Sequence, residues 1–434
     1  MAQFRTDQHK LDFSNNKTRY EVMMLDDRIS PSGTMTDAFG RLRISSPFTI
    51  FDSNHRFADN GLWATSNTAG GTYAFITNQS TVGLSVTTAS GAEVIRESKR
   101  VFSYQPGKSL LVMNTFVMNT PLTNLRQRVG YFGAQNGLYL ENDGVTNYFV
   151  LRSYISGSIV EQRIAQADWN RDKFDGTGYS AQTGGSDHTG GIRVDRSNIL
   201  WFDIEWLGVG DVRCGFVVDG KMVIAHVFHN DNVNLAPYMT TASLPIRYEI
   251  TNTGATAESS MLKQICSTVI SEGGYELRGT QISIGTDIVT PKTLGAAGAT
   301  YSMVSIRLKT TRLNAVVIPS AASVLPVSTG NFMWKLIQNG VTSGGSWVSA
   351  GNDSAVEYNL TGTSVTGGRV VASGLLTTTN QSTINVDILR ASLLKFQLER
   401  DSLAGTPEEF IIAMSSDGSG DTAYATLDWE EVTR

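Results

Sequence analysis

Two carboxylates, Asp203 and Glu205, lie two residues apart in the largely apolar run 199–207. Alternate residues of a β-strand project from one face, and some retaining β-sandwich glycosidases carry their catalytic acids in this way. Trp201 occupies the preceding alternate position, where that arrangement needs another carboxylate. The intervening apolar residues would face the core. We therefore assign Asp203 and Glu205 to a solvated outer face and predict no catalytic residues and no enzyme.

His226, His229 and Asp231 form the pattern His-x-x-His-x-Asp. A catalytic zinc ion needs three protein ligands that are held in place by further contacts. Residues three apart on a strand point to opposite faces, so only a turn beginning near Phe228 would bring the two imidazoles together. We predict exposed loop histidines, with no metal and no other cofactor.

The sequence has no glycine-rich phosphate loop between a strand and a helix, no Gly-x-Ser-x-Gly elbow and no Cys-His pair placed for nucleophilic attack. Cys214 and Cys266 are interpreted as small buried hydrophobic residues. Several aromatic residues have Gly, Ser, Asn or Thr neighbours, which suits protein contacts or stacking on sugar rings. These candidates for a glycan or partner surface are Trp63, Tyr148, Tyr179 and Trp347.

The composition is that of an all-β protein. Charged residues make up 17% of the 434 residues, whereas glycine is abundant at 42 residues. The net charge of −5 argues against nucleic acid as a partner, because phosphate binding needs clustered Lys and Arg. No run approaches about 18 apolar residues and the first ten residues contain no apolar leader, so we expect no membrane insertion.

Short alternating apolar runs, separated by Gly, Asn, Asp and Pro, predict the strands. The clearest set is a meander formed by residues 199–207, 212–218 and 221–228, in which Asp219-Gly220 makes the second turn. Strands at this spacing predict two antiparallel β-sandwich domains that are jelly-roll-like. The succession of strand, turn, Val-Asp-Gly and strand also resembles concanavalin-like lectin sandwiches.

The pattern divides the chain into four segments. Residues 1–35 are polar and lack a core, which predicts an extended N-terminal arm; it reaches a neighbouring subunit or is a frayed terminus, and the sequence leaves both open. Residues 36–285 form a β-sandwich with long loops. Residues 286–300, which are small and mostly uncharged, form a linker, and residues 301–434 form a C-terminal β-sandwich.

Residues 36–53 read T-D-A-F-G-R-L-R-I-S-S-P-F-T-I-F-D-S. This run resembles the segment D-A-F-G-R-L-R-V-S-x-P-x-T-L-F-D near the N-terminus of many tailed-bacteriophage virion proteins. Further stretches resemble the same family in the same order: 104–108, 128–132, 205–213 and 244–250, with a looser match at 306–309. The resemblance covers roughly residues 36–280.

The resemblance implies a non-enzymatic structural component of a virion, in the tail, neck or capsid surface, assembled in the host cytoplasm. Its mechanism would be attachment to other virion proteins through the arm and the segment that follows it. The expected docking residues are Asp37, Phe39, Arg41, Arg43, Phe48, Phe51 and Asp52. Whether the two guanidiniums bridge an interface or form intrachain salt bridges stays open. The alternatives are a receptor-binding protein that holds host glycan and, third, a glycan-cleaving tail enzyme.

Several predicted strands are nearly free of charge, namely 81–87, 110–118 and 370–376. Soluble monomers usually protect sheet edges with Lys, Pro or inward charge. Because such protection is scarce here, we predict a homo-oligomer, with a trimer as the first expectation.

Overall fold

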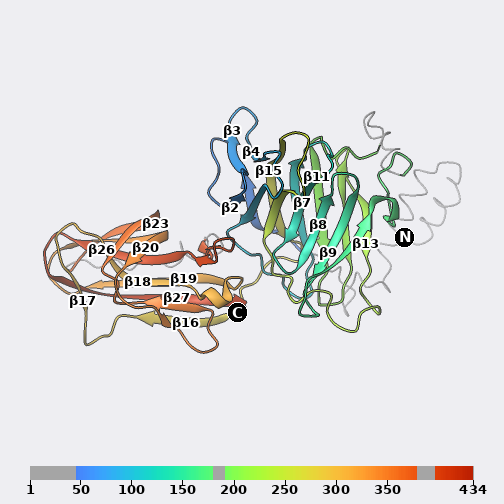
Figure 1. The fold of residues 1–434 in the computed structure, drawn as a ribbon. Coiled ribbons are helices and arrows are strands. Elements are labelled where there is room, and N and C mark those ends of the chain that lie inside the picture. Colours follow the sequence, from blue (N-terminus) through green and yellow to red (C-terminus); the bar gives the residue numbers. More distant parts are fainter. Residues whose placement is uncertain (1–44, 179–190, 379–395, 434) are drawn as a thin grey trace, which may run out of the picture. The chain divides into compact units, whose positions relative to one another are not determined.

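The computed structural model describes residues 45–178, 191–378 and 396–433. These residues are largely β-strand, with two short 3₁₀ helices, η1 (Gln166–Asp168) and η2 (Thr310–Arg312), and no α-helix. The strands form two antiparallel β-sandwiches (Figure 1), which confirms the predicted fold class.

Some sequence-based predictions lie outside the described residues. They concern the arm (1–35) and the candidates Asp37, Phe39, Arg41, Arg43 and Tyr179. Within the described part of the chain, no helix has the length and apolar character of a membrane span.

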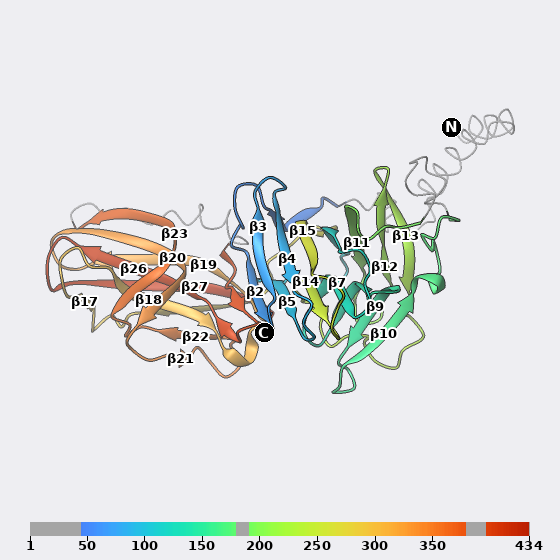
Figure 2. The ribbon, with the colours of Figure 1, turned by 45° about the horizontal axis from the view of Figure 1, so that its top comes forward.

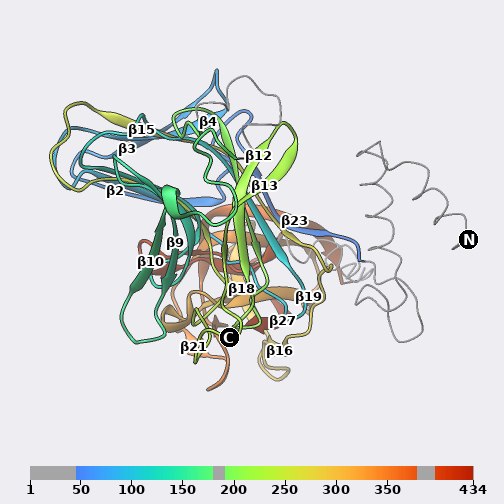
Figure 3. The same cartoon turned by 90° about the vertical axis from the view of Figure 1, so that its right-hand side faces the viewer.

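The N-terminal sandwich consists of an eight-stranded and a seven-stranded sheet. The first sheet has the order β13 (Lys221–Phe228), β12 (Val212–Val218), β11 (Asn198–Ile204), β6 (Leu110–Val117), β15 (Ser260–Ser271), β4 (Thr81–Val86) and β3 (Thr72–Ile76), with β1 (Phe48–Asn54) also on β15. The second has the order β10 (Val160–Ala165), β9 (Asn147–Ser153), β8 (Gly137–Asn142), β7 (Leu125–Phe132), β14 (Ile246–Asn252), β5 (Glu93–Ser98) and β2 (Trp63–Thr68). Figure 3 shows β9 and β10 in one layer and β12 and β13 in the other.

The predicted meander is confirmed by the neighbouring strands β11, β12 and β13. Asp219 and Gly220 have φ values of 49° and 74°, which is the left-handed backbone that a tight two-residue hairpin turn requires. Alternate residues of β11 point into the core between the sheets. Phe202 is fully buried there and meets Phe149 of the opposite sheet at a ring distance of 6.1 Å.

Residues 48–53, the end of the segment 36–53, lie in β1. This strand pairs with the second half of β15, while β4 pairs with the first half on the same side. Phe51 points inward, is 4% exposed and packs against Phe102 at 4.8 Å. Asp52, the next residue, points outward. Residues 48–54 are therefore a structural part of the sandwich.

The C-terminal sandwich has its own hydrophobic core. Its four-stranded sheet has the order β16 (Thr280–Gly285), β27 (Asp421–Thr433) and β17 (Lys292–Leu294), with β19 (Val316–Pro326) also on β27. Its six-stranded sheet has the order β21 (Val348–Ser349), β22 (Val356–Asn359), β18 (Tyr301–Leu308), β26 (Glu409–Ser416), β20 (Asn331–Ser343) and β23 (Ser364–Thr377), of which β18, β20, β23 and β26 are labelled in Figure 2. A small ribbon joins β24 (Arg400–Asp401) and β25 (Thr406–Pro407).

The predicted boundary at residues 285 and 286 is wrong. β16, which was assigned to the first sandwich, pairs along its length with β27 near the C-terminus. Residues 292–294 of the predicted linker form β17, which pairs with the same strand. The chain therefore enters the second sandwich by Thr280, because β27 offers backbone partners that local composition does not reveal.

Residues 48–434 form one compact unit, in which buried polar contacts join the two sandwiches. Arg400 donates to the carbonyl of Ser98 at 2.6 Å and forms an ion pair with Glu97 at 3.0 Å. Arg100 forms a second ion pair with Glu399 at 2.7 Å. Arg400, Glu97 and Glu399 are nearly inaccessible to water. Their ion pairs and hydrogen bonds therefore require one defined arrangement of these side chains where the two sandwiches meet.

Candidate functional site

Asp203 and Glu205 do not form a catalytic pair. The half-buried Asp203 accepts a hydrogen bond from Ser109 and forms an ion pair with Arg213 at 3.4 Å. Glu205 lies just beyond β11 and is exposed. Trp201 shares the outer side of β11 with Asp203 but is 2% exposed, so the predicted solvated face is partly covered.

The structure separates the two histidines of the possible metal motif. His226 is buried in β13, where its Nδ1 accepts a hydrogen bond from the backbone N–H of Asn170. Burial lowers the pKa of His226 to about 4, and His229 adds to the shift. His229 lies in the following loop and is exposed, as predicted for a loop histidine.

A different set of possible metal ligands contains Asp211 in place of His226. The ligand atoms of Asp211, His229 and Asp231 all lie within 4.8 Å of one another, and no other such group of three occurs in the described residues. Nδ1 of His229 lies 2.8 Å from Oδ2 of Asp211, a hydrogen bond that accounts for the pair without a cation. Strand register could have indicated Asp211, because the start of β12 lies opposite the end of β13.

The aromatic candidates do not share one surface. Trp63 is 5% exposed and donates a hydrogen bond to Ser53, so its assignment to an exposed surface is wrong. Tyr148 in β9 is half-buried, with the guanidinium of Arg163 4.1 Å from its ring centroid. Trp347 lies in the C-terminal sandwich, half-buried under the guanidinium of Arg307 at 3.9 Å.

Three of the expected docking residues lie in the described part of the chain, and they differ in how exposed their side chains are. Phe48 is 39% exposed and stacks on Tyr275 at a ring distance of 6.0 Å. Asp52 is exposed, and both residues are accessible to a partner. The assignment of Phe51 to an interface is wrong, because its side chain fills the core.

An unpredicted set of charged residues covers the outer face of the seven-stranded sheet. In β7, Arg128 alternates with core-facing residues, so its guanidinium projects away from the core. Its Nε lies 2.6 Å from Glu141 of β8 and its NH1 lies 3.3 Å from Glu249 of β14. Arg152 of β9 extends the set by an ion pair with Glu161 of β10 at 2.8 Å. We call these five residues the Arg–Glu face.

The Arg–Glu face is buried although it lies outside the sandwich core. The side chains of Arg128, Glu141 and Glu249 are 8%, 1% and 5% exposed. Tyr139 lies between the arginines, with the guanidiniums of Arg128 and Arg152 at 5.2 and 5.1 Å from its ring centroid. The two guanidinium groups and the ring of Tyr139 therefore pack as a layer, which shields the charges of the Arg–Glu face from water.

The electrostatics of this face oppose acid–base catalysis. Burial raises the pKa of Glu249, but the charges of Arg247, Arg128 and Arg126 outweigh it and lower the pKa below its ordinary value. Burial also opposes ionisation of Glu161, whose pKa is lowered overall by hydrogen bonds from Tyr139 and Arg152. A glycosidase acid needs a raised pKa to hold its proton near neutral pH. With lowered pKa values, these two carboxylates stay ionised near neutral pH, where they can orient or bind other groups.

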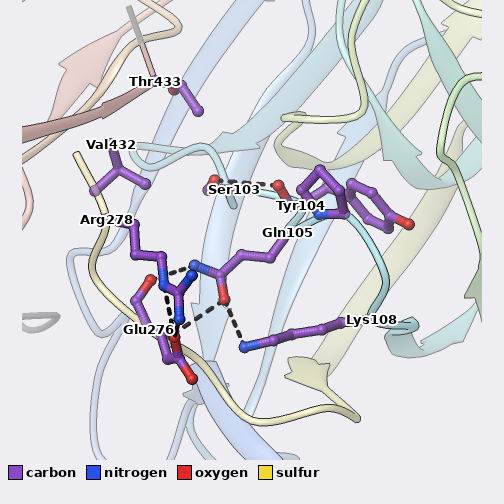
Figure 4. A pocket seen from close by; sticks show the side chains of 9 residues that line it. Ser103, Tyr104, Gln105, Lys108, Glu276, Arg278, Val432 and Thr433 are labelled. Atoms are coloured by element: carbon purple, nitrogen blue, oxygen red, sulfur yellow. Dashed lines mark hydrogen bonds and ion pairs between the residues drawn. The ribbon is translucent and has the colours of Figure 1, made fainter.

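A cavity of about 550 Å³ lies beside residues 104–108, one of the phage-like stretches (Figure 4). Gln105 lies at its centre, where its Oε1 accepts from Lys108 Nζ at 2.9 Å and from the backbone N–H of Glu276 at 3.1 Å. Arg278 donates to the Glu276 carboxylate at 2.7 Å. The wall is therefore polar and fixed by hydrogen bonds, as a binding site for a polar ligand would need.

No protein-family model and no curated protein matches the chain. Similar solved structures include a carbohydrate esterase from the Shiga toxin-encoding bacteriophage phi24B, with 11% identity, 52% of this chain and 100% of that chain covered, and a TM-score of 0.31. A β-1,3-glucanase from Mycobacterium marinum has 8% identity, covers 51% of this chain and 98% of its own, and has a TM-score of 0.34. The botulinum neurotoxin serotype G binding domain has 8% identity and a TM-score of 0.31, and the match covers 62% of this chain and 59% of that chain. Likenesses this distant carry no argument about activity or ligand.

Proposed function

We propose that this protein is a non-enzymatic structural component of a tailed-phage virion and acts by protein–protein attachment. The observation that carries the proposal is the likeness of residues 36–53 to the N-terminal segment of such virion proteins. Residues 48–53 of that segment belong to β1. The part before β1 would then attach to other proteins of the particle, in the tail, neck or capsid surface.

The state of the carboxylates supports a non-enzymatic role. Asp203 is held by Ser109 and Arg213, and the acids of the Arg–Glu face are paired with guanidiniums. A glycan-cleaving tail enzyme would need two carboxylates that are free to act on the substrate, whereas these carboxylates are engaged with side chains of the protein.

Self-association remains part of the proposal. The uncharged runs 81–87 and 110–118 form β4 and β6. β4 lies between β15 and β3, and β6 lies between β11 and β15, so both strands are paired on both sides within the chain. Residues 370–376 lie in β23, which pairs only with β20 in the described sheet. This edge is available to a second copy, and a trimer stays the first expectation.

Deleting residues 1–35 is expected to remove this protein from assembled particles, because attachment is assigned to the arm. The deletion should leave the melting temperature of the purified protein unchanged, since the polar composition of the arm predicts that it lacks a core of its own. Particle composition by mass spectrometry is the measurement. A Gly/Ser replacement of equal length is the control for spacing and should fail in the same way. Normal incorporation of the deleted protein would contradict the docking role.

The double replacement Asp203→Asn and Glu205→Gln is expected to lower the free energy of unfolding by no more than about 1 kcal/mol, because Arg213, the ion-pair partner of Asp203, is 54% exposed. Arg213→Gln should give a similar loss. We expect no release of reducing sugar from bacterial surface polysaccharide by the parent protein or the variant. Sugar release by the parent that disappears in the double variant would establish a hydrolase and overturn the non-enzymatic proposal.

A further inference from the structure

A second cavity, of about 440 Å³, adjoins the one in Figure 4. The two share Tyr104, Pro106 and Thr433, so the hollows adjoin at these residues, and we call them together the cleft. Each hollow has the size of a small-molecule site. The cleft therefore has room for a chain of linked rings, with one part of the ligand in each hollow.

One wall of the second hollow is aromatic. Tyr104 and Trp206 meet edge to face at a ring distance of 5.8 Å. Trp206 is partly exposed, but its indole Nε1 is buried and has no hydrogen-bond partner in the described structure. The accessible part of Trp206 is thus ring carbon. Such a surface packs against the C–H face of a sugar ring.

The lining of the second hollow also supplies hydroxyl groups. Oγ1 of Thr240 accepts a hydrogen bond from the side-chain amide of Asn136 at 2.7 Å. Oγ1 of Thr241 accepts one from the backbone N–H of Ser243 at 3.0 Å. Because a hydroxyl has one hydrogen to donate, both threonines are fixed as acceptors within the protein and keep their hydrogens for a ligand.

The cleft carries an excess of positive charge in a chain of net charge −5. Among the described residues, Glu276 is the only carboxylate that lines the cleft, and it is paired with Arg278. Lys108 is bound to the neutral amide of Gln105, and Arg312 donates to the backbone carbonyl of Asp353 at 2.7 Å. Neither Lys108 nor Arg312 has a carboxylate partner among the described residues. One of these cations lines each hollow.

We propose that this cleft binds an acidic oligosaccharide. Trp206, backed by the buried ring of Tyr104, receives a sugar ring. Thr240 and Thr241 donate to its hydroxyls, and Lys108 and Arg312 receive two negative groups along the chain. Carboxylate and phosphate both suit these cations, so uronic-acid and phosphorylated sugars share the required chemistry. This site is independent of the virion assignment, and it uses none of the aromatic residues expected from the sequence.

Isothermal titration of the full chain tests the proposal. The probes are trigalacturonate and a phosphorylated pentamannoside, which distinguish the two anionic sources, with maltotriose and a triglutamate peptide as comparisons. The parent should bind at least one acidic saccharide, and bind it more tightly than either comparison. Lys108→Gln and Arg312→Gln should each weaken binding by roughly tenfold, as expected for one charge-assisted hydrogen bond.

Lys221→Gln is the matched control, because Lys221 is an exposed lysine at the turn between β12 and β13, away from the residues that line the cleft. It should bind the saccharide as the parent does, and all variants should keep the parent melting temperature. Three results would overturn the proposal: no binding of either acidic saccharide at millimolar concentration, equal binding of maltotriose or triglutamate, or undiminished binding by the double variant Lys108→Gln and Arg312→Gln.

Discussion

Replacing Arg128 by alanine is expected to lower the free energy of unfolding by about 1.5–3 kcal/mol, because it removes a buried cation that donates charged hydrogen bonds to two buried carboxylates. Glu141 keeps its pair with Arg163, and Glu249 keeps its pair with Arg126. Arg128 contacts both Glu141 and Glu249, and all three side chains are less than one tenth exposed. Denaturant unfolding of the parent and the variant measures the difference. Arg213→Ala is the control, since Arg213 is 54% exposed and its pair with Asp203 should contribute less than about 1 kcal/mol.

Acidification gives this prediction a second, distinctive readout. The pKa of Glu249 is lowered in the folded protein, so its contribution to stability is complete above its unfolded pKa and is lost as pH falls through the folded value. The parent should therefore lose stability on acidification below about pH 4.5, the ordinary pKa of a glutamate. In Arg128→Ala, Glu249 keeps Arg126 and Arg247 but has lost one cation, so its protonation costs less stability than in the parent. The stability gap between parent and variant should narrow as pH falls, and a constant gap would contradict the electrostatic account.

Local signals in the sequence were sufficient for the fold class and for the central meander. The alternation in residues 199–207 fixes which side chains of β11 face the core, and Asp219-Gly220 fixes the turn between β12 and β13. Both depend on neighbours within a few residues. The period of two and the need for positive φ are properties of the local chain, and for that reason they can be predicted without knowledge of distant partners.

Features that depend on distant pairing could not be predicted in this way. Trp63 and Phe51 were assigned to exposed surfaces, but β2 pairs with β5, β1 pairs with β15, and both rings point into the core. The Arg–Glu face brings Arg128 to Glu249 across 121 positions of sequence. Its members are ordinary outward-facing charges when each strand is considered alone. Only the order of strands in the sheet shows that they neutralise one another.

Replacing Trp429 by alanine is expected to destabilise the C-terminal sandwich by about 3–5 kcal/mol, the usual effect of truncating a buried tryptophan. Trp429 is 0% exposed in β27, the strand that pairs with β16, β17 and β19. Its Nε1 donates to Glu431 at 3.1 Å, so truncation also removes a buried hydrogen bond. Differential scanning calorimetry is the measurement, and Trp347→Ala is the control. Trp347 is half-buried under Arg307, and loss of its cation–π contact should contribute only about 0.5–1 kcal/mol.

The calorimetric profile of Trp429→Ala also tests whether the sandwiches unfold separately. The core around Phe202 and Phe149 shares no residue with the core around Trp429, so each sandwich has its own source of apolar stabilisation. We expect two transitions, of which the variant shifts one and leaves the other in place. Arg400 and Glu97 couple the sandwiches, but one buried ion pair contributes little net stability compared with two complete cores. A single transition that moves as a whole would contradict separate folding, and it would mean that the junction makes residues 48–434 one cooperative unit.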